Sequence, residues 1–168
     1  IFIGAHVETI GPIQDERFNP VNLTKKELHV PSTREIPVLN EKIHDAVKKE
    51  ILSASKEGDS IGGTIECAGI GIPPGLGDPM FDGIKNRLSA IIFGIPAIQG
   101  IEFGTGFAAA KLKGSEHNDP YYIENRIVKT KTNHHGGVLG GITTGMPLIF
   151  RVAIKPTSSI PKKQNTVN

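Results

Sequence analysis

An alternation of apolar and polar positions predicts a β-strand near the end of the chain. Two sets of side chains alternate from 148 to 155: Leu148, Phe150, Val152 and Ile154 in one set, and Ile149, Arg151, Ala153 and Lys155 in the other. Because a strand places alternate side chains on opposite faces, we expect one apolar face and one face that carries two cations, Arg151 and Lys155. Pro156 ends the strand, since it has no N–H to donate.

Helical periodicity predicts two amphipathic helices. The first covers residues 38–55, and its apolar stripe consists of Leu39, Ile43, Ala46, Val47, Ile51 and Leu52. The second begins at Asp78, which can cap it, with Pro79 in the first turn, and it ends before Pro96. We expect its buried stripe to contain Phe81, Ile84, Leu88, Ile91 and Ile92.

Further strands are predicted at residues 1–13, 60–68 and 101–107, whereas residues 121–132 are amphipathic without a clear period. Residues 15–37 are polar and interrupted by three prolines, so we expect a loop excursion. Strands and helices are mixed without a strict βαβ repeat, which favours the α+β class.

Composition narrows the range of function classes. A chain of 168 residues with 38% hydrophobic and 21% charged residues suits one globular domain. The net charge of +2 gives no broad field for nucleic acid or membrane surfaces. The single cysteine, Cys67, lies in an apolar run and is expected to be a buried thiol in a reducing compartment. The chain starts inside the apolar run Ile1–Ile3, and we expect it to be a piece of a longer protein.

Glycines are concentrated in short stretches, which indicates local roles. Residues 69–77 superficially resemble a nucleotide-binding loop, but Pro73 and Pro74 remove two of the amide donors that such a loop needs. We therefore expect a close crossing of two backbones there. Residues 133–141 place four glycines after two histidines, which permits close approach of a flat ligand or of another backbone.

The paired histidines His134 and His135 invite a metal-site hypothesis, but adjacent side chains point in different directions and no third ligand has suitable spacing. A turn or a close-packing site is the alternative. Lys155 and the hydroxyl residues after Pro156 resemble an anion-binding strand end, although a basic strand end is more often a solvated surface. The residues alone thus predict an α+β domain with glycine-lined edges suited to a flat anionic ligand.

Six segments, taken in order, closely resemble the chorismate synthase family across nearly the whole chain. They are residues 58–63 (GDSIGG), 73–82 (PPGLGDPMFD), 95–107 (IPAIQGIEFGTGF), 114–119 (GSEHND), 133–142 (NHHGGVLGGI) and 155–160 (KPTSSI). The resemblance implies a sandwich with outer β-sheets and helices packed between them, of which residues 1–168 form the central portion of a single domain.

The resemblance also implies an activity. The family converts 5-enolpyruvylshikimate 3-phosphate to chorismate and phosphate by an anti-1,4-elimination, a carbon–oxygen lyase reaction of the shikimate pathway of aromatic amino-acid biosynthesis. The reaction needs reduced FMN, which is thought to donate an electron transiently and to recover it. The family resemblance further implies a cytoplasmic homotetrameric flavoprotein with a link to NADP, and no nucleic-acid or membrane partner.

Family flavin contacts carry over by resemblance to a few positions of this chain. They are Pro96, Ala97, Gly140, Lys155, Pro156, Thr157, Ser158 and Ser159. Gln99 departs from the family, which often has lysine there. We expect no catalytic residue and no metal ligand within residues 1–168, because the family's Gly-Glu-Ser-His-Gly, Arg-Pro-Gly-His-Ala-Asp, Ser-Ala-Arg-Glu and Arg-His-Asp-Pro motifs do not occur in the chain. The chain is therefore expected to be inactive alone. A non-catalytic glycine-rich interaction or assembly domain is the alternative.

Overall fold

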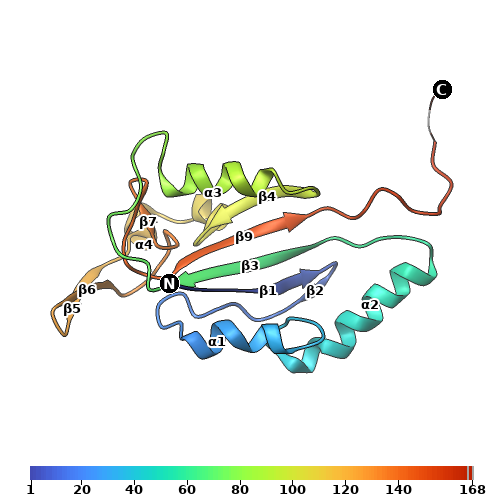
Figure 1. Ribbon diagram of the computed structural model, residues 1–168, viewed down its shortest axis with the longest axis horizontal. Helices are drawn as coiled ribbons and strands as arrows, with labels where there is room; N and C mark the ends of the chain where they lie inside the picture. The colour runs from blue at the N-terminus through green and yellow to red at the C-terminus, as the bar shows by residue number, and fades with distance from the viewer. Residues whose placement is uncertain (166, 168) are drawn as a thin grey trace.

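The computed structural model describes residues 1–165 and 167, and its centre is a five-stranded sheet (Figure 1). All neighbouring strands are antiparallel, in the order β2-β1-β3-β9-β4. These strands are β1 (Phe2–Ile10), β2 (Ile13–Gln14), β3 (Gly63–Ile70), β4 (Ile98–Phe103) and β9 (Leu148–Ile154). The strand predicted over residues 1–13 is thus a hairpin, because the chain turns at Gly11 with a φ of 49°.

The register of the sheet places one polar row across four strands. His6 faces Glu66, Glu66 faces Arg151, and Arg151 faces Glu102. The strand predicted at the end of the chain is confirmed as β9. However, its cationic face is not a solvated one at Arg151, which is only 4% exposed.

The first predicted helix, over residues 38–55, is confirmed as α2 (His44–Lys56), but its start is wrong: the 3₁₀ turn η2 (Glu41–Ile43) precedes it, and residues 38–40 are not helical. Val47 is the buried centre of its apolar stripe, while Ile51 and Leu52 stay exposed. Figure 1 shows α1 and α2 beside β1, whereas α3 lies beside β4 at the opposite edge of the sheet.

The start of the second predicted helix is wrong. Helix α3 (Ile84–Phe93) begins five residues later than expected, with Gly83 rather than Asp78 as its N-cap, while Asp78 forms an isolated bridge with Asp82. The physical reason is tertiary: the N–H of Ile84 donates to the carbonyl oxygen of Gly141 at 2.9 Å, so the preceding turn is held by another segment. The predicted stripe is partly wrong: Phe81 is 83% and Ile91 70% exposed, whereas Ile84 and Leu88 are half-buried and Ile92 is buried.

Residues 15–37, predicted as a loop excursion, contain α1 (Lys25–His29) and the 3₁₀ turn η1 (Val30–Thr33). Thr24 and Glu27 form a capping box that starts α1. Three apolar side chains of the excursion form a core cluster with two residues of the sheet: Phe18, Leu23, Leu28, Ala68 and Ile149. The excursion therefore covers one face of the sheet, and its apolar residues, sparse in the sequence, supply part of the core.

Short elements fill the region between β4 and β9. They are η3 (Gly106–Lys111), α4 (Gly114–His117), β5 (Tyr121–Glu124), β6 (Ile127–Thr130), β7 (Val138–Leu139) and β8 (Ile142–Thr143). The ambiguous residues 121–132 are a β-hairpin whose turn residues, Asn125 and Arg126, have positive φ. No helix in residues 1–165 and 167 has the length and apolar character needed to cross a membrane.

The expected crossing of backbones is confirmed at the first glycine loop. A Cβ atom at Gly77 would lie 2.4 Å from the carbonyl oxygen of Gly141, so only glycine fits. Thr143 ties the same loop down, because its hydroxyl donates to the carbonyl oxygen of Pro73 at 2.7 Å and accepts from the N–H of Leu76 at 2.9 Å.

Candidate functional site

The end of strand β9 lies directly against the turn that follows helix α3. The N–H of Lys155 donates to the carbonyl oxygen of Ala97 at 3.0 Å. Ala97 has a φ of 72°, a left-handed conformation that is costly for a residue with a Cβ and that persists only where the surroundings impose it. Two parts of the predicted flavin site, Pro96–Ala97 and residues 155–159, are therefore neighbours in space.

The segment after Lys155 carries donors that the protein itself does not use. Residues 155–159 are exposed. Within the described part of the chain, the Lys155 ammonium has no ion-pair partner and the hydroxyls of Thr157, Ser158 and Ser159 make no hydrogen bond. One cation and three hydroxyls are thus available to an anionic group, which charge-assisted hydrogen bonds would hold.

Residues 58–62 brace this segment, a role that the sequence did not assign to them. The hydroxyl of Ser60 donates to the carbonyl oxygen of Thr157 at 2.6 Å, and Lys162 pairs with Asp59 at 2.5 Å. A Cβ at Gly62 would lie 2.6 Å from the carbonyl oxygen of Ile154, so glycine is required for this close packing. In the sequence, only the glycine pair of residues 62–63 indicated that another backbone segment packs closely here.

Gly140 lies apart from these residues, in the turn between β7 and β8. Its neighbour Gly141 holds the start of α3, whereas Ala97 follows the end of that helix. Ten helical residues rise about 15 Å, so a ligand that contacts both ends must be elongated. Gly140 has a φ of 60°, and a Cβ built there would meet no atom within 4 Å, which leaves its backbone open to a ligand.

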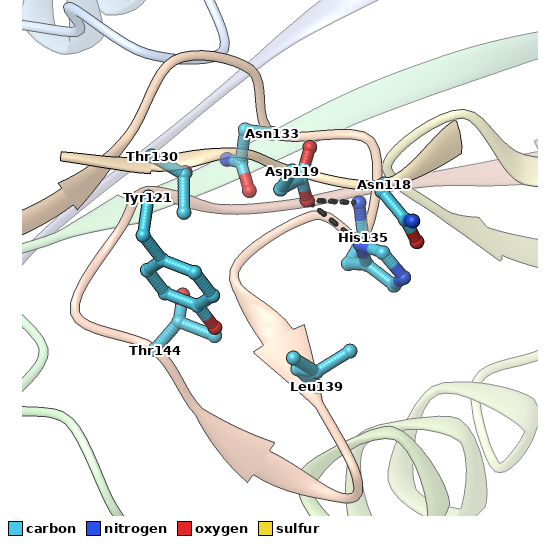
Figure 2. Close-up of a pocket in the computed structure, with 8 residues that line it drawn as sticks. All are labelled: Asn118, Asp119, Tyr121, Thr130, Asn133, His135, Leu139 and Thr144. Carbon is cyan, nitrogen blue, oxygen red and sulfur yellow. Dashed lines mark hydrogen bonds and ion pairs between the residues drawn. The ribbon is translucent and has the colours of Figure 1, made fainter. Parts of the chain in front are cut away.

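Asp119 organises the histidine pair into a folded turn beside a cavity of about 290 Å³ (Figure 2). Its carboxylate accepts from the hydroxyl of Thr132 at 2.7 Å, from the N–H of His134 at 2.7 Å, and from Nδ1 of His135 at 2.7 Å. Burial acts to raise the pKa of Asp119, but these hydrogen bonds outweigh it and lower the pKa.

The turn alternative for the paired histidines is confirmed. A Cβ at Gly136 would lie 2.4 Å from the backbone nitrogen of Gly104, so two chain segments pack closely there. The ring of His117 lies 4.7 Å from that of His135, and burial together with the nearby His135 and His134 lowers the pKa of His117. Among residues 1–165 and 167, no three His, Cys, Asp or Glu side chains are arranged to hold a metal ion.

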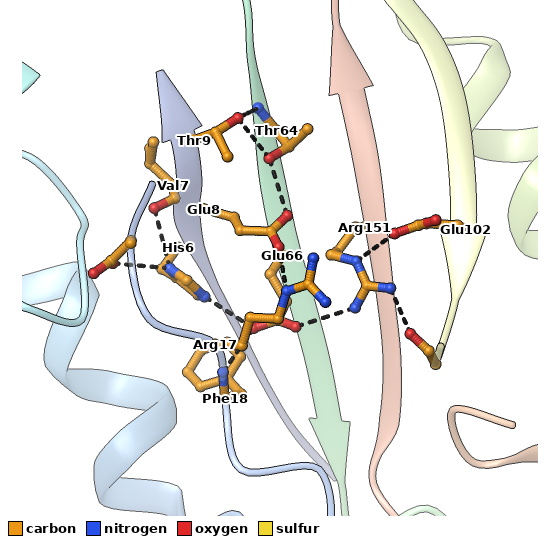
Figure 3. Close-up of polar contacts among 12 residues, drawn as sticks. His6, Val7, Glu8, Thr9, Arg17, Phe18, Thr64, Glu66, Glu102 and Arg151 are labelled. Atoms are coloured by element: carbon orange, nitrogen blue, oxygen red, sulfur yellow. Dashed lines mark hydrogen bonds and ion pairs between the residues drawn. The ribbon is translucent and has the colours of Figure 1, made fainter. Parts of the chain in front are cut away.

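A buried ionic row crosses the sheet on the face that the excursion covers (Figure 3). Nε2 of His6 lies 3.0 Å from Oε2 of Glu66, and Nδ1 lies 3.3 Å from Oδ2 of Asp15. Arg151 donates through Nε to Glu102 at 2.7 Å and lies 3.5 Å from Oε1 of Glu66. Arg151 shares the predicted face with Lys155 but is buried against Glu66 and Glu102, so only Lys155 contributes to the exposed cationic end of β9.

The antiparallel sheet and its flanking helices define an α+β domain, in which strand β9 ends at an exposed lysine followed by exposed hydroxyl residues. Comparison with known proteins identifies the family of this domain: residues 1–168 match the family described as chorismate synthase. The chain belongs to the chorismate synthase family.

Individual relatives agree with this assignment. A chorismate synthase of Thermococcus gammatolerans and one of Pyrococcus abyssi are each 45% identical over 168 residues, which is all of this chain and 45% of each relative. One from Korarchaeum cryptofilum is 50% identical over 129 residues, 77% of this chain and 36% of the relative. The chain thus spans less than half the length of these curated relatives.

A solved structure supports the fold. The crystal structure of a chorismate synthase superimposes with a TM-score of 0.85 at 30% identity, over 94% of this chain and 49% of the other. The predicted α+β class and the predicted chorismate synthase fold are therefore confirmed.

Proposed function

We propose that the protein to which this chain belongs is a lyase that eliminates phosphate from 5-enolpyruvylshikimate 3-phosphate to form chorismate, with reduced FMN as cofactor. The contact between Lys155 and Ala97 carries the proposal. It joins two segments that family resemblance assigns to the flavin and that lie 58 positions apart in the sequence.

The residues present fit a flavin phosphate. Lys155 offsets the negative charge, and the unused hydroxyls of Thr157, Ser158 and Ser159 supply hydrogen bonds to phosphate oxygens. The loop at Ser60 holds their backbone in place, so the donors are preorganised. When bound, reduced FMN supplies the transient electron that the elimination needs, and the protein supplies binding and orientation.

Gly140 is proposed to contact the same cofactor at the other end of α3. Its backbone is open, and an elongated molecule with a flat ring system spans the distance along the helix. The chain's contribution is thus to hold and orient the cofactor.

Proton transfer is not assigned to residues 1–168. His6 is 1% exposed, and both of its ring nitrogens face carboxylate oxygens, so it is not available to a substrate. We propose that residues 1–168 expressed alone bind flavin weakly and form no chorismate.

Assembly as a homotetramer in the cytoplasm is part of the same proposal. Exposed apolar side chains on and after α3 support further packing: Ile91 is 70% exposed, and Phe93 and Ile95 are exposed as well. 5-Enolpyruvylshikimate 3-phosphate is the proposed small-molecule partner, with no nucleic acid or membrane involved.

The test is an anaerobic assay of the full-length protein with reduced FMN and 5-enolpyruvylshikimate 3-phosphate, in which chorismate absorbance and phosphate release are followed together. We expect both products in equal amounts, and none without flavin or with oxidised flavin. Chorismate formed by residues 1–168 alone would contradict the assignment of proton chemistry elsewhere. A full-length protein that binds FMN but never releases phosphate would favour a non-catalytic role.

A further inference from the structure

A second cavity lies on the covered face of the sheet, between the excursion and the loop before the paired histidines. Its volume is about 450 Å³, which falls in the range of small-molecule sites. Phe18, Pro20, Val21, Ala108 and Ile149 provide an apolar lining. Arg17, Lys131 and Arg151 bring three cations to the same cavity.

The walls of this cavity are tied together rather than loosely apposed. The N–H of Phe18 donates to Oε2 of Glu66 at 2.7 Å, which fixes the excursion to the sheet. The amide of Asn133 donates to the carbonyl oxygens of Pro20 and Pro147 at 2.8 Å each, which links the excursion to the loop that carries Lys131. The cavity is therefore a built feature of the fold.

Lys131 supplies the unpaired positive charge of this cavity, because Arg17 pairs with Glu8 and Arg151 pairs with Glu66 and Glu102. Glu66 is the one carboxylate in the lining, and both of its oxygens are used: Oε2 accepts from His6 and from Phe18, and Oε1 faces Arg151. Lys131 has no ion-pair partner in the described part of the chain. Arg17 engages Glu8 through Nε alone, which leaves both terminal nitrogens free to donate.

Arg151 also lines the cavity and has N–H groups that no acceptor among the described residues uses. It is 4% exposed and uses one hydrogen on each of Nε, Nη1 and Nη2, toward Glu102, Glu66 and the carbonyl oxygen of Gly104. A guanidinium has five N–H groups, so two remain. In the view of Figure 3 the Arg17 guanidinium lies in front of Glu66, and Arg151 extends toward Glu66 from β9.

We propose that this cavity binds a small organic anion, with a carboxylate or a phosphate directed to Arg17, Lys131 and Arg151 and with an apolar body against Phe18, Val21 and Ile149. Planar guanidinium groups suit two-point hydrogen bonding to either headgroup, and the apolar lining favours a ring over a bare inorganic ion. This site goes beyond the flavin contacts, since none of the residues 96, 97, 140 or 155–159 lines it.

The test uses the full-length protein without flavin and three probes: benzoate, phenyl phosphate and uncharged benzyl alcohol. Affinity is measured by calorimetry and by NMR shift changes. We expect at least one anion to bind more tightly than the alcohol and to weaken with rising ionic strength. The better of the two anions identifies the headgroup.

Variants locate the binding. Lys131→Gln and Arg17→Gln should each weaken the better anion about tenfold, the effect of one lost charged hydrogen bond. Lys129→Gln is the matched control, because Lys129 lies on the same hairpin but pairs with Glu124 outside the cavity lining. Should Arg17→Gln disturb folding through Glu8, Lys131→Gln still decides the question. Equal affinity for anions and alcohol, or affinity unchanged in Lys131→Gln, would overturn the proposal.

Discussion

The N–H of Lys155 and the carbonyl oxygen of Ala97 are 3.0 Å apart, which joins the end of strand β9 to the turn after helix α3. The residues next to Lys155 and Ala97 in the sequence do not predict this hydrogen bond. The contact exists because β4 and β9 pair in the sheet and bring their ends together.

Loss of the Lys155 charge should weaken flavin binding. In the full-length protein, Lys155→Ala is expected to cost roughly 1–3 kcal/mol of FMN binding free energy, because a charged hydrogen bond to phosphate is removed. Flavin fluorescence titration measures this cost. Lys163→Ala is the control, since Lys163 is an exposed lysine of the same terminal segment outside the proposed site. Equal FMN affinity in the parent and Lys155→Ala would count against the assigned role.

The left-handed backbone at Ala97 predicts an unusual response to glycine. Ala97→Gly should stabilise the protein by up to about 1 kcal/mol, because glycine adopts a positive φ without a Cβ clash. Ala46→Gly, at an exposed position of helix α2, should destabilise the protein by about 1 kcal/mol. Urea denaturation curves of both variants provide the comparison. Destabilisation by Ala97→Gly as large as that by Ala46→Gly would refute the strain at Ala97.

Glu66 should be among the most sensitive positions in the chain. Glu66→Gln removes the charge that faces His6 and Arg151 in a buried site, so we expect a loss of about 3 kcal/mol in unfolding free energy. Glu57→Gln, at the exposed end of α2, should change stability by less than about 0.5 kcal/mol. Denaturation midpoints of the two variants measure the difference, and similar values would show that the ionic row contributes little.

The lowered pKa of Asp119 predicts an acid-dependent loss of stability. A carboxyl group with a folded-state pKa below its unfolded value stabilises the fold above the unfolded pKa, and this contribution disappears as pH falls through the folded pKa. Asp119→Asn should therefore be less stable than the parent at neutral pH, and the gap should narrow below the ordinary aspartate pKa of 3.8. Unfolding free energies from pH 7 downward measure it; a gap that is constant with pH would contradict the linkage.

Cys67 should react slowly with thiol reagents in the folded protein. Burial, followed by the negative charge of Glu66, raises the pKa of the Cys67 thiol to about 11, so little thiolate is present near neutral pH. Iodoacetamide labelling followed by mass spectrometry should show a rate that climbs toward pH 11. The urea-unfolded chain, as control, should react readily at pH 8 to 9. Rapid labelling of the native protein at neutral pH would exclude this environment.

Sequence patterns predicted those elements correctly in which the apolar positions of the element itself repeat with the period of a strand or a helix. The alternation through β9 and the periodicity of α2 arise from burial on one side of an element, and both were predicted correctly. The start of α3 was not, because its first N–H bonds to Gly141 rather than to an Asp78 cap, and such a partner is distant in sequence.

In the candidate site, too, some features follow from the sequence and others only from the structure. Residue types at 155–159 predict anion binding without a structure, since a lysine and hydroxyls at a strand end are the groups that hold a phosphate. Arg151 has the same charge and face in the pattern, yet Glu66 and Glu102 neutralise it inside the sheet. Hydrophobic periodicity and local residue chemistry, which depend on near neighbours, thus determined the strands, the main helix, the glycine turns and the family resemblance. Tertiary structure alone decided which charges are free and which ends meet, because strand register sets those distances between residues far apart in the chain.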